Sequence, residues 1–267
     1  MRRVIPVSDP HDPRIAAYRD VRERDLVGRL DRFVAEGEVV LRQMARAGRF
    51  AFESLLIAEN RVAALADLVS ALPDEVPVYV AGREAMKTIV GFPIHRGALA
   101  IGVIPEPGDP ARLLARPHDR ALAIGCVGLA NHDNVGGIFR NAAAFGAQAV
   151  LLDAACCDPL YRKAIRVSVG AALTTPFARC ADAHAMLDLF AAAGFEVFAL
   201  TPRGAVTLEE AAARAGPRRA LLLGAEGPGL PEDVIARATG VRIDMAGGFD
   251  SLNVATTAGI ALYALSR

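Results

Sequence analysis

The stretch ALAIGCVGLANHDNVGGIFRNAAAFGA, residues 121–147, decides the fold of this protein. It opens with a near-continuous apolar run, which predicts a buried strand, and ends in IFRNAAAFG, which predicts a helix. Gly136 and Gly137 permit a tight turn between the two, so we expect Arg140 in the first turn of the helix, beside its exposed N–H groups. A strand, a polar loop and a helix in this order are typical of an α/β protein.

Further apolar runs follow, separated by helical sequence. They are AVLLD at 149–153, EVFALT at 196–201, RALLLGA at 219–225 and VRIDM at 241–245. Near-continuous apolar strands of this kind are typical of a parallel sheet that is covered on both faces. Such sheets bind ligands beyond the carboxyl ends of their strands, so we expect the functional site at the loops that follow these runs.

The first part of the chain has a different organisation. Short apolar runs at 32–37, 54–58, 76–81 and 97–104 alternate with helical stretches at 38–48 and 61–72, which predicts a small α/β sandwich. The segment EPGDPARLLARP at 106–117 is rich in proline and has the composition of a linker. We therefore expect a first domain over 1–105, a linker over 106–118 and a second domain over 119–267.

The composition excludes several classes of protein. The 267 residues are 53% hydrophobic, with 30 basic and 30 acidic side chains, which excludes a disordered tail and argues against a bulk binder of polyanions. No apolar run reaches the ~20 residues of a membrane span, so we expect a cytoplasmic protein without a membrane partner. The four cysteines form no C-x-x-C pair and are expected to be buried thiols, and the five scattered histidines predict no metal site.

Arginine dominates the basic residues. Lys87 and Lys163 are the two lysines, and residues 14–49 hold nine arginines against six acids. Arginine suits bidentate recognition of phosphate and stacking on bases, which favours an RNA partner for this segment. A biased genome composition produces the same ratio, so both explanations stay open.

Two further loops carry polar residues at strand ends. The loop 221–234 contains Gly224, Glu226, Gly227 and Gly229; with Asp244 it imitates a dinucleotide-binding fingerprint, but Glu226 would then lie among the phosphate-binding amides. The loop after 241–245 leads to a final helix that we expect Ser251 to cap. Leu252 and Asn253 would then lie in its first turn, where an asparagine favours stability only if its amide has a partner.

Taken together, the three loops resemble the SpoU (TrmH-type) branch of the SPOUT RNA methyltransferases. The resemblance rests on three ordered motifs: N-x-G-x-x-x-R-x-A-x-x-F-G at 134–146, L-G-x-E-G-x-G-L at 223–230, and I-x-M followed by S-L-N-V-A between 243 and 255. Two positions depart from the family pattern. The first motif often begins with D-P where this chain has His132-Asp133, and the third usually reads I-P-M where this chain has Asp244.

The resemblance implies an α/β fold with a C-terminal knotted (trefoil) parallel-sheet SPOUT methyltransferase domain and a smaller N-terminal L30e-like α/β domain that binds the RNA substrate. It implies S-adenosyl-L-methionine as cofactor, methyl transfer to a ribose 2′-hydroxyl of rRNA or tRNA, and a homodimer formed through the knotted domain. The positions matching the family's catalytic residues are Arg140, Asn134, Glu226, Ser251 and Asn253. Those matching its cofactor-binding residues are Thr201, Gly224, Ile243, Met245 and Leu252, with Thr201 assigned by its place at a strand end.

Two other functions compete with this one. One is a catalytically inactive RNA-binding or ribosome-assembly protein with the same fold, against which the joint presence of four residues argues: Arg140, Glu226, Ser251 and Asn253. A nucleotide-dependent oxidoreductase, resting on Gly224 and Asp244, is the other.

Overall fold

The computed structural model describes residues 4–19, 23–90, 97–115, 120–247 and 251–267. Its chain forms two compact units. The first consists of Met1–Glu106 together with Leu160–Thr174, and the second of Pro107–Pro159 together with Thr175–Arg267.

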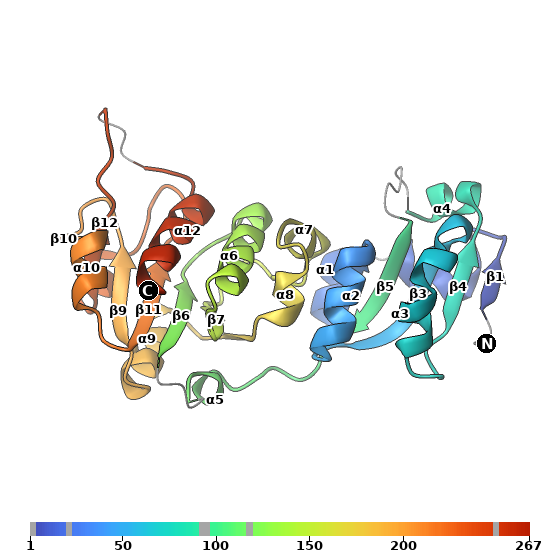
Figure 1. Ribbon diagram of the computed structural model, residues 1–267, viewed down its shortest axis with the longest axis horizontal. Helices are drawn as coiled ribbons and strands as arrows, with labels where there is room; N and C mark the ends of the chain where they lie inside the picture. Colours follow the sequence, from blue (N-terminus) through green and yellow to red (C-terminus); the bar gives the residue numbers. More distant parts are fainter. Residues whose placement is uncertain (1–3, 20–22, 91–96, 116–119, 248–250) are drawn as a thin grey trace. The chain divides into compact units, whose positions relative to one another are not determined.

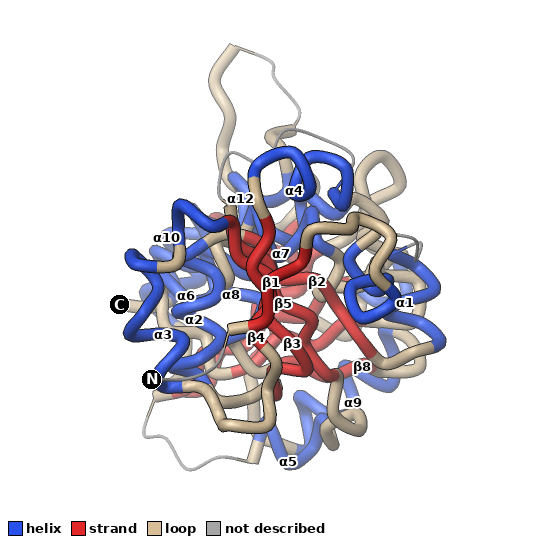
Figure 2. Tube along the Cα trace, turned by 90° about the vertical axis from the view of Figure 1, so that its right-hand side faces the viewer, coloured by secondary structure: helices blue, strands red, loops and turns tan. Residues whose placement is uncertain are grey.

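The first unit is built on a mixed five-stranded sheet in the order β1-β4-β3-β5-β2. Strands β1, β4 and β3 run parallel, and β5 is antiparallel to both β3 and β2. In Figure 2 α2 and α3 lie on one side of these strands and α1 lies on the other. The strands are β1 (Ile5–Val7), β2 (Arg32–Glu36), β3 (Ala51–Ala58), β4 (Val78–Ala81) and β5 (Ala98–Val103), and the α-helices of residues 1–106 are α1 (Glu23–Arg29), α2 (Glu38–Ala47), α3 (Ala66–Ala71) and α4 (Arg83–Val90).

The core of the first unit explains why these strands form. Apolar side chains from β3, β4 and β5 pack with Ile15 and Tyr18 of the 3-10 helix Pro13–Tyr18. The hydroxyl of Tyr18 lies 2.7 Å from the Ser54 hydroxyl, so a polar group buried by this packing keeps a hydrogen bond. The four apolar runs predicted in this part of the chain are all strands.

The second unit is built on a seven-stranded sheet in which all strands are parallel, in the order β10-β12-β9-β11-β6-β7-β8 (Figure 1). Its centre is fully apolar, as the predicted runs required, and every residue of β6 and β7 is buried. The strands are β6 (Ala121–Cys126), β7 (Ala149–Leu152), β8 (Phe177–Arg179), β9 (Glu196–Leu200), β10 (Val206–Thr207), β11 (Arg218–Leu223) and β12 (Thr239–Arg242).

Helices cover both faces of this sheet. One layer contains α6 and α12, which pack on each other, with α10 against α12; α5 and α9 pack together in the other layer. The helices of this unit are α5 (Pro110–Leu114), α6 (His132–Ala144), α9 (Ala183–Ala192), α10 (Leu208–Arg214), α11 (Glu232–Ile235) and α12 (Val254–Leu265). The parallel sheet therefore directs the carboxyl ends of β6, β9, β11 and β12 toward one edge.

The short helices α7 (Arg162–Val167) and α8 (Ala171–Thr174) belong to the first unit. There α7 packs on β2 and α8 on α2, and Arg162 forms an ion pair of 3.0 Å with the buried carboxylate of Glu36. The sequence placed this stretch within 119–267. The boundaries 1–105, 106–118 and 119–267 stay predictions, and residues 116–118 of the linker lie outside the described residues.

Candidate active site

Three loops at the carboxyl edge of the second sheet enclose a cavity of about 570 Å3. They follow β9, β11 and β12, as the parallel topology predicts. All five residues predicted to bind cofactor line it, and so do three of those predicted to be catalytic: Thr201, Gly224, Ile243, Met245, Leu252, Glu226, Ser251 and Asn253. Apolar side chains of Leu200, Ile243, Met245 and Val254 form much of the wall.

A chain of hydrogen bonds joins the three motifs beside this cavity. Asn253 Nδ2 donates to Asn134 Oδ1 at 2.8 Å, and Asn134 Nδ2 donates to Glu226 Oε1. Asn134 is 3% exposed, and both the oxygen and the nitrogen of its buried amide have a hydrogen-bond partner within the protein. Residues more than 90 positions apart in the sequence are thereby held together at one point.

The helix α12 begins later than the sequence predicted. Its N-cap is Asn253, whose Oδ1 accepts from the N–H groups of Ala255 at 2.9 Å and Thr256 at 3.3 Å, so Ser251 is not the cap. Asparagine and serine are equally good N-caps, which is why the sequence did not decide between them. The amide of Asn253 thus caps the helix with its oxygen and reaches Asn134 with its nitrogen.

The helix α6 begins earlier than predicted. Its N-cap is Asn131, whose side chain accepts from Asp133 N–H, so Gly136 and Gly137 lie inside the helix and not in a turn before it. A Cβ atom on Gly137 would come within 2.7 Å of the Ala255 Cβ. The glycine therefore allows α6 and α12 to approach closely, and Asn141 Nδ2 donates to the Ala255 carbonyl at 2.7 Å next to it.

Arg140 consequently lies more than two turns into α6, not in its first turn. Its side chain is exposed, and no hydrogen bond or ion pair to it is found within the described ranges. Since it projects from the helix that carries Asn134, this guanidinium is available to a ligand outside the protein.

The loop 224–230 doubles back on itself and does not open directly into a helix. Gly229 N–H donates to the Ala225 carbonyl at 3.0 Å, and the two residues form an isolated β-bridge. A dinucleotide-binding fingerprint would instead present a helix N-terminus to phosphate. Asp244, the acid that this alternative needed for a ribose, is paired with Arg242 at 2.8 Å.

The sequence itself assigns the family. A profile of the SpoU rRNA Methylase family matches residues 121–263, which is more than half of the chain. The protein belongs to the SpoU family. The match contains every strand and loop of the cavity described above.

Relatives with similar sequences include an uncharacterized tRNA/rRNA methyltransferase of Mycobacterium tuberculosis. The two sequences are 41% identical over an alignment of 269 positions, which covers 98% of this chain and 91% of the relative. Another, from Synechocystis, is 34% identical over 57% of this chain and 54% of the relative.

Solved structures with a similar fold cover both units of the SpoU protein. An AdoMet-bound rRNA methyltransferase from Sinorhizobium meliloti has a TM-score of 0.82 at 23% identity, over 98% of this chain and 97% of its own. An RNA 2′-O ribose methyltransferase has a TM-score of 0.77 at 26% identity, over 98% of both chains.

Asp153 is a buried acid beside the site that sequence reasoning missed. Its carboxylate accepts hydrogen bonds from the N–H groups of Gly128 (3.0 Å), Ala155 (3.1 Å) and Cys156 (2.9 Å). Leu129 N–H also donates to the Cys156 sulfur at 3.3 Å. The loop that leads from β6 to α6 in this SpoU protein is therefore tied to the loop after β7. The signal in the sequence was a single acid at the end of an apolar strand.

The cysteines lie close to this loop and are all free thiols. Burial raises the pKa of Cys126 well above its usual range, that of Cys156 to about 12, and those of Cys157 and Cys180 to about 11. Over the described residues, no group of three or more His, Cys, Asp or Glu is placed to hold a metal ion. No helix in that same part of the chain is long and apolar enough to cross a membrane.

Proposed function

We propose that this protein transfers the methyl group of S-adenosylmethionine to a ribose 2′-hydroxyl of rRNA or tRNA in the cytoplasm. The observation that carries the proposal is the Asn253–Asn134–Glu226 chain, which joins all three family motifs beside one cavity. Family membership supports the methyl-transfer reaction, and similarity to a solved RNA 2′-O ribose methyltransferase at 26% identity supports the ribose.

The cavity suits S-adenosylmethionine in size and chemistry. Sites for ligands of this size are about 300–1,000 Å3 and mostly apolar, with a few placed polar groups. Here Ile243, Met245 and Leu252 supply apolar surface for a nucleobase, and the exposed carboxylate of Glu226 supplies negative charge. When bound, the cofactor supplies an electrophilic methyl on a sulfonium.

Arg140 is proposed to orient the ribose-phosphate and to stabilise negative charge that develops on the 2′-oxygen. An alternative role as general base requires the guanidinium pKa to fall from about 12.5 to about 7, which costs roughly 7 kcal/mol. The 2′-hydroxyl proton is therefore proposed to leave through the substrate phosphate or water.

Asn134, Glu226, Ser251 and Asn253 are proposed to position cofactor and ribose. Asn134 holds Glu226 by one of its oxygens, Oε1, and Asn253 in turn holds Asn134. Methyl transfer is an in-line displacement, so the gain from these residues is alignment of the two reacting atoms.

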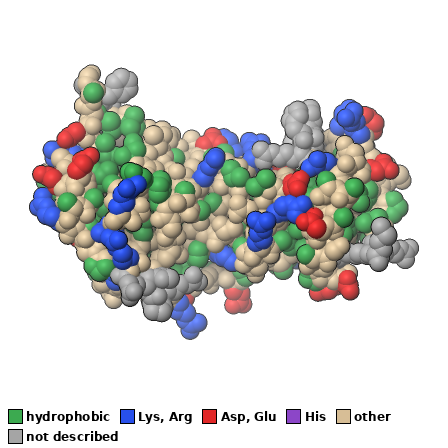
Figure 3. Space-filling view, viewed as in Figure 1, with side chains coloured by type: hydrophobic (Ala, Val, Ile, Leu, Met, Phe, Trp, Pro, Cys, Tyr) green, Lys and Arg blue, Asp and Glu red, His purple; other side chains and the backbone are tan. Residues whose placement is uncertain are grey.

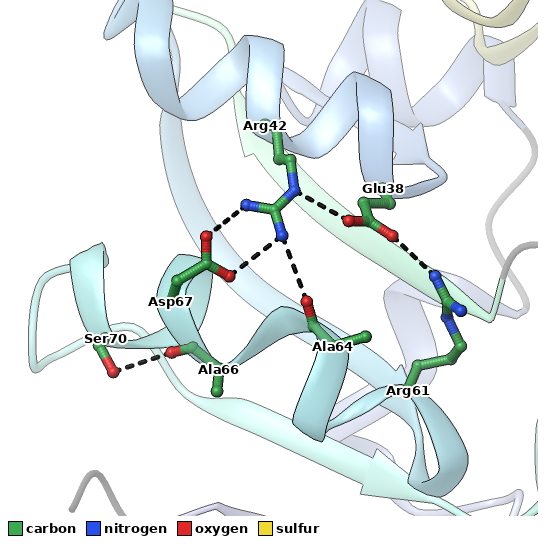
Figure 4. A network of polar contacts seen from close by, with 7 residues as sticks. All are labelled: Glu38, Arg42, Arg61, Ala64, Ala66, Asp67 and Ser70. Carbon is green, nitrogen blue, oxygen red and sulfur yellow. Dashed lines mark hydrogen bonds and ion pairs between the residues drawn. The ribbon is translucent and has the colours of Figure 1, made fainter.

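The first unit, an L30e-like domain in this proposal, is proposed to hold structured RNA. Within it, acids already pair with several arginines of the segment 14–49. Figure 4 shows that Arg42 contacts both Glu38 and Asp67, and that Arg61 contacts the second oxygen of Glu38. Arg14 and Arg32 are likewise paired. Arg46 is exposed and has no hydrogen bond or ion pair to the described residues, whereas Arg22 and the side chain of Arg24 lie outside them.

A trefoil knot and a homodimer through the second unit complete the proposal. Support for the knot comes from the path of the chain, since β12 lies between β9 and β10 whereas the following helix α12 packs on α6 and β11. Support for the dimer comes from Ile260 and Tyr263 of α12, which are 40% and 49% exposed although both are large and apolar. Figure 3 shows hydrophobic side chains as a green band beside this helix.

The test is labelled-methyl transfer from S-adenosylmethionine to total rRNA and tRNA, followed by alkaline hydrolysis. A 2′-O-methyl ribose blocks cleavage of the next phosphodiester, so the label is expected in alkali-resistant dinucleotides. We expect Arg140→Lys to lower turnover at least about 10-fold, because a lysine ammonium lacks the planar fork of arginine.

Arg112→Lys is the matched control, since this exposed arginine of the same unit is paired with Asp109 and lies outside the cavity. Label in a base, or full turnover by Arg140→Lys, would contradict the proposal. Cofactor and RNA binding without transfer would instead establish the inactive RNA-binding protein.

A further inference from the structure

Arg242, the last residue of β12, joins two of the loops that line the cavity. Its Nη1 donates to the carbonyls of Gly204 at 3.0 Å and Ala205 at 3.1 Å, in the loop that follows β9. Its Nε donates to Asp244 Oδ1 at 2.8 Å, in the loop that follows β12. One guanidinium therefore connects the loop of Thr201 to the loop of Ile243 and Met245.

The backbone at this junction is closely packed. Thr201 N–H donates to the Val241 carbonyl at 2.9 Å. A Cβ atom on Gly204 would lie 2.4 Å from the Val241 carbonyl carbon, so only glycine fits there. The Gly204 and Ala205 carbonyls thus have a defined position, in which both accept hydrogen bonds from Arg242.

Position 244 is where this chain departs from the I-P-M pattern of its family. A proline holds its own φ near −65°, which restricts the loop through the backbone. Aspartate imposes no such restriction. In this chain the carboxylate of Asp244 instead binds the guanidinium that holds the neighbouring loop.

We propose that the Arg242–Asp244 pair is a positioning device for the cofactor site, which restrains the two loops through side chains as a proline at position 244 would restrain one of them through the backbone. The inference rests on the proposed function, because it concerns the affinity for S-adenosylmethionine. The two side chains are 34% and 69% exposed, so the pair contributes little to the stability of the fold. Its effect lies in ordering the two loops before the ligand arrives.

The test is calorimetry of the full-length protein with S-adenosylmethionine. We expect Arg242→Gln and Asp244→Asn each to weaken binding about five-fold, and the double variant to be no weaker than Arg242→Gln alone, because both changes break one interaction. Asp244→Pro should bind more tightly than Asp244→Asn. Raising the salt to about 1 M should weaken binding to the wild type more than to Asp244→Pro.

The matched control is Arg237→Gln. Arg237 pairs with Asp188 in the same unit, the two side chains are 40% and 69% exposed, and neither lines the cavity. Binding by Arg242→Gln within about two-fold of wild type, or an equal loss in Arg237→Gln, would overturn the inference while the proposed function stands. A wild-type protein that does not bind S-adenosylmethionine would overturn the proposed function itself, and this inference with it.

Discussion

At the scale of single residues, Asn134 combines two roles that no other side chain type combines as well. Its amide is a donor at one end and an acceptor at the other, and it lies between the carboxylate of Glu226 and the amide of Asn253. Glutamine has the same groups on a longer chain, and aspartate has no donor when ionised. The sequence predicted the three residues as functional, but it did not predict that they bind one another.

We expect Asn134→Asp to lower turnover by about 100-fold, because a carboxylate beside Glu226 repels it and displaces the aligned groups. The measurement is methyl transfer under saturating substrates, with cofactor affinity determined separately. Asn60→Asp, an exposed position in the first unit, is the control for the same chemical change. Turnover that is unchanged in Asn134→Asp would show that the hydrogen-bonded chain has no part in the reaction.

At the scale of elements, strands were predicted better than helix starts. The apolar run of β6 was predicted as a buried strand and is one, whereas the start of α6 contains three residues that can cap a helix, Asn131, Asp133 and Asn134. Gly137, expected in a turn, lies inside α6 and packs against Ala255, which is more than 100 residues away in the sequence. The contacts of Asp153 with Gly128, and of Arg242 with the Gly204 and Ala205 carbonyls, were missed because these partners lie on other loops.

The loop between β6 and α6 should depend on Asp153. Gly128 N–H contacts both oxygens of Asp153, so in Asp153→Asn the new NH2 group faces this donor in either orientation of the amide, and we expect the loop to shift and Asn134 to move with it. We expect turnover per cofactor-binding site to fall about 10-fold or more.

Asp182→Asn is the comparison, because this carboxylate caps α9 and accepts from Ala185 N–H away from the cavity. If both variants lose thermal stability but Asp153→Asn keeps full turnover per cofactor-binding site, Asp153 has a purely structural role.

At the scale of the whole molecule, the buried thiols are expected to lower the free energy of unfolding at alkaline pH. Their pKa values are raised to about 11 for Cys157 and Cys180 and to about 12 for Cys156. Above the pKa of about 8.5 in the unfolded chain, the unfolded state loses protons that the folded state keeps. The free energy of unfolding should therefore be unaffected below that pH and fall as the pH rises from about 9 to about 11.

Urea unfolding between about pH 8 and pH 10.5 measures this effect. Cys180→Ala should reduce the slope of stability against pH, since one of the titrating groups is removed. A midpoint that stays constant or rises over this range would contradict the expectation.

The packing of residues 160–174 in the first unit restricts how the two units can be exchanged during evolution. The chain crosses from one unit to the other after Glu106, after Pro159 and after Thr174. A gene fusion or exchange with a single breakpoint would separate α7 and α8 from the helix and strand on which they pack. The two units are therefore expected to have diverged as a pair. A Cβ atom on Gly170 would lie 3.3 Å from the Val40 Cα, so we expect substitutions in α2 to be matched by substitutions around Gly170.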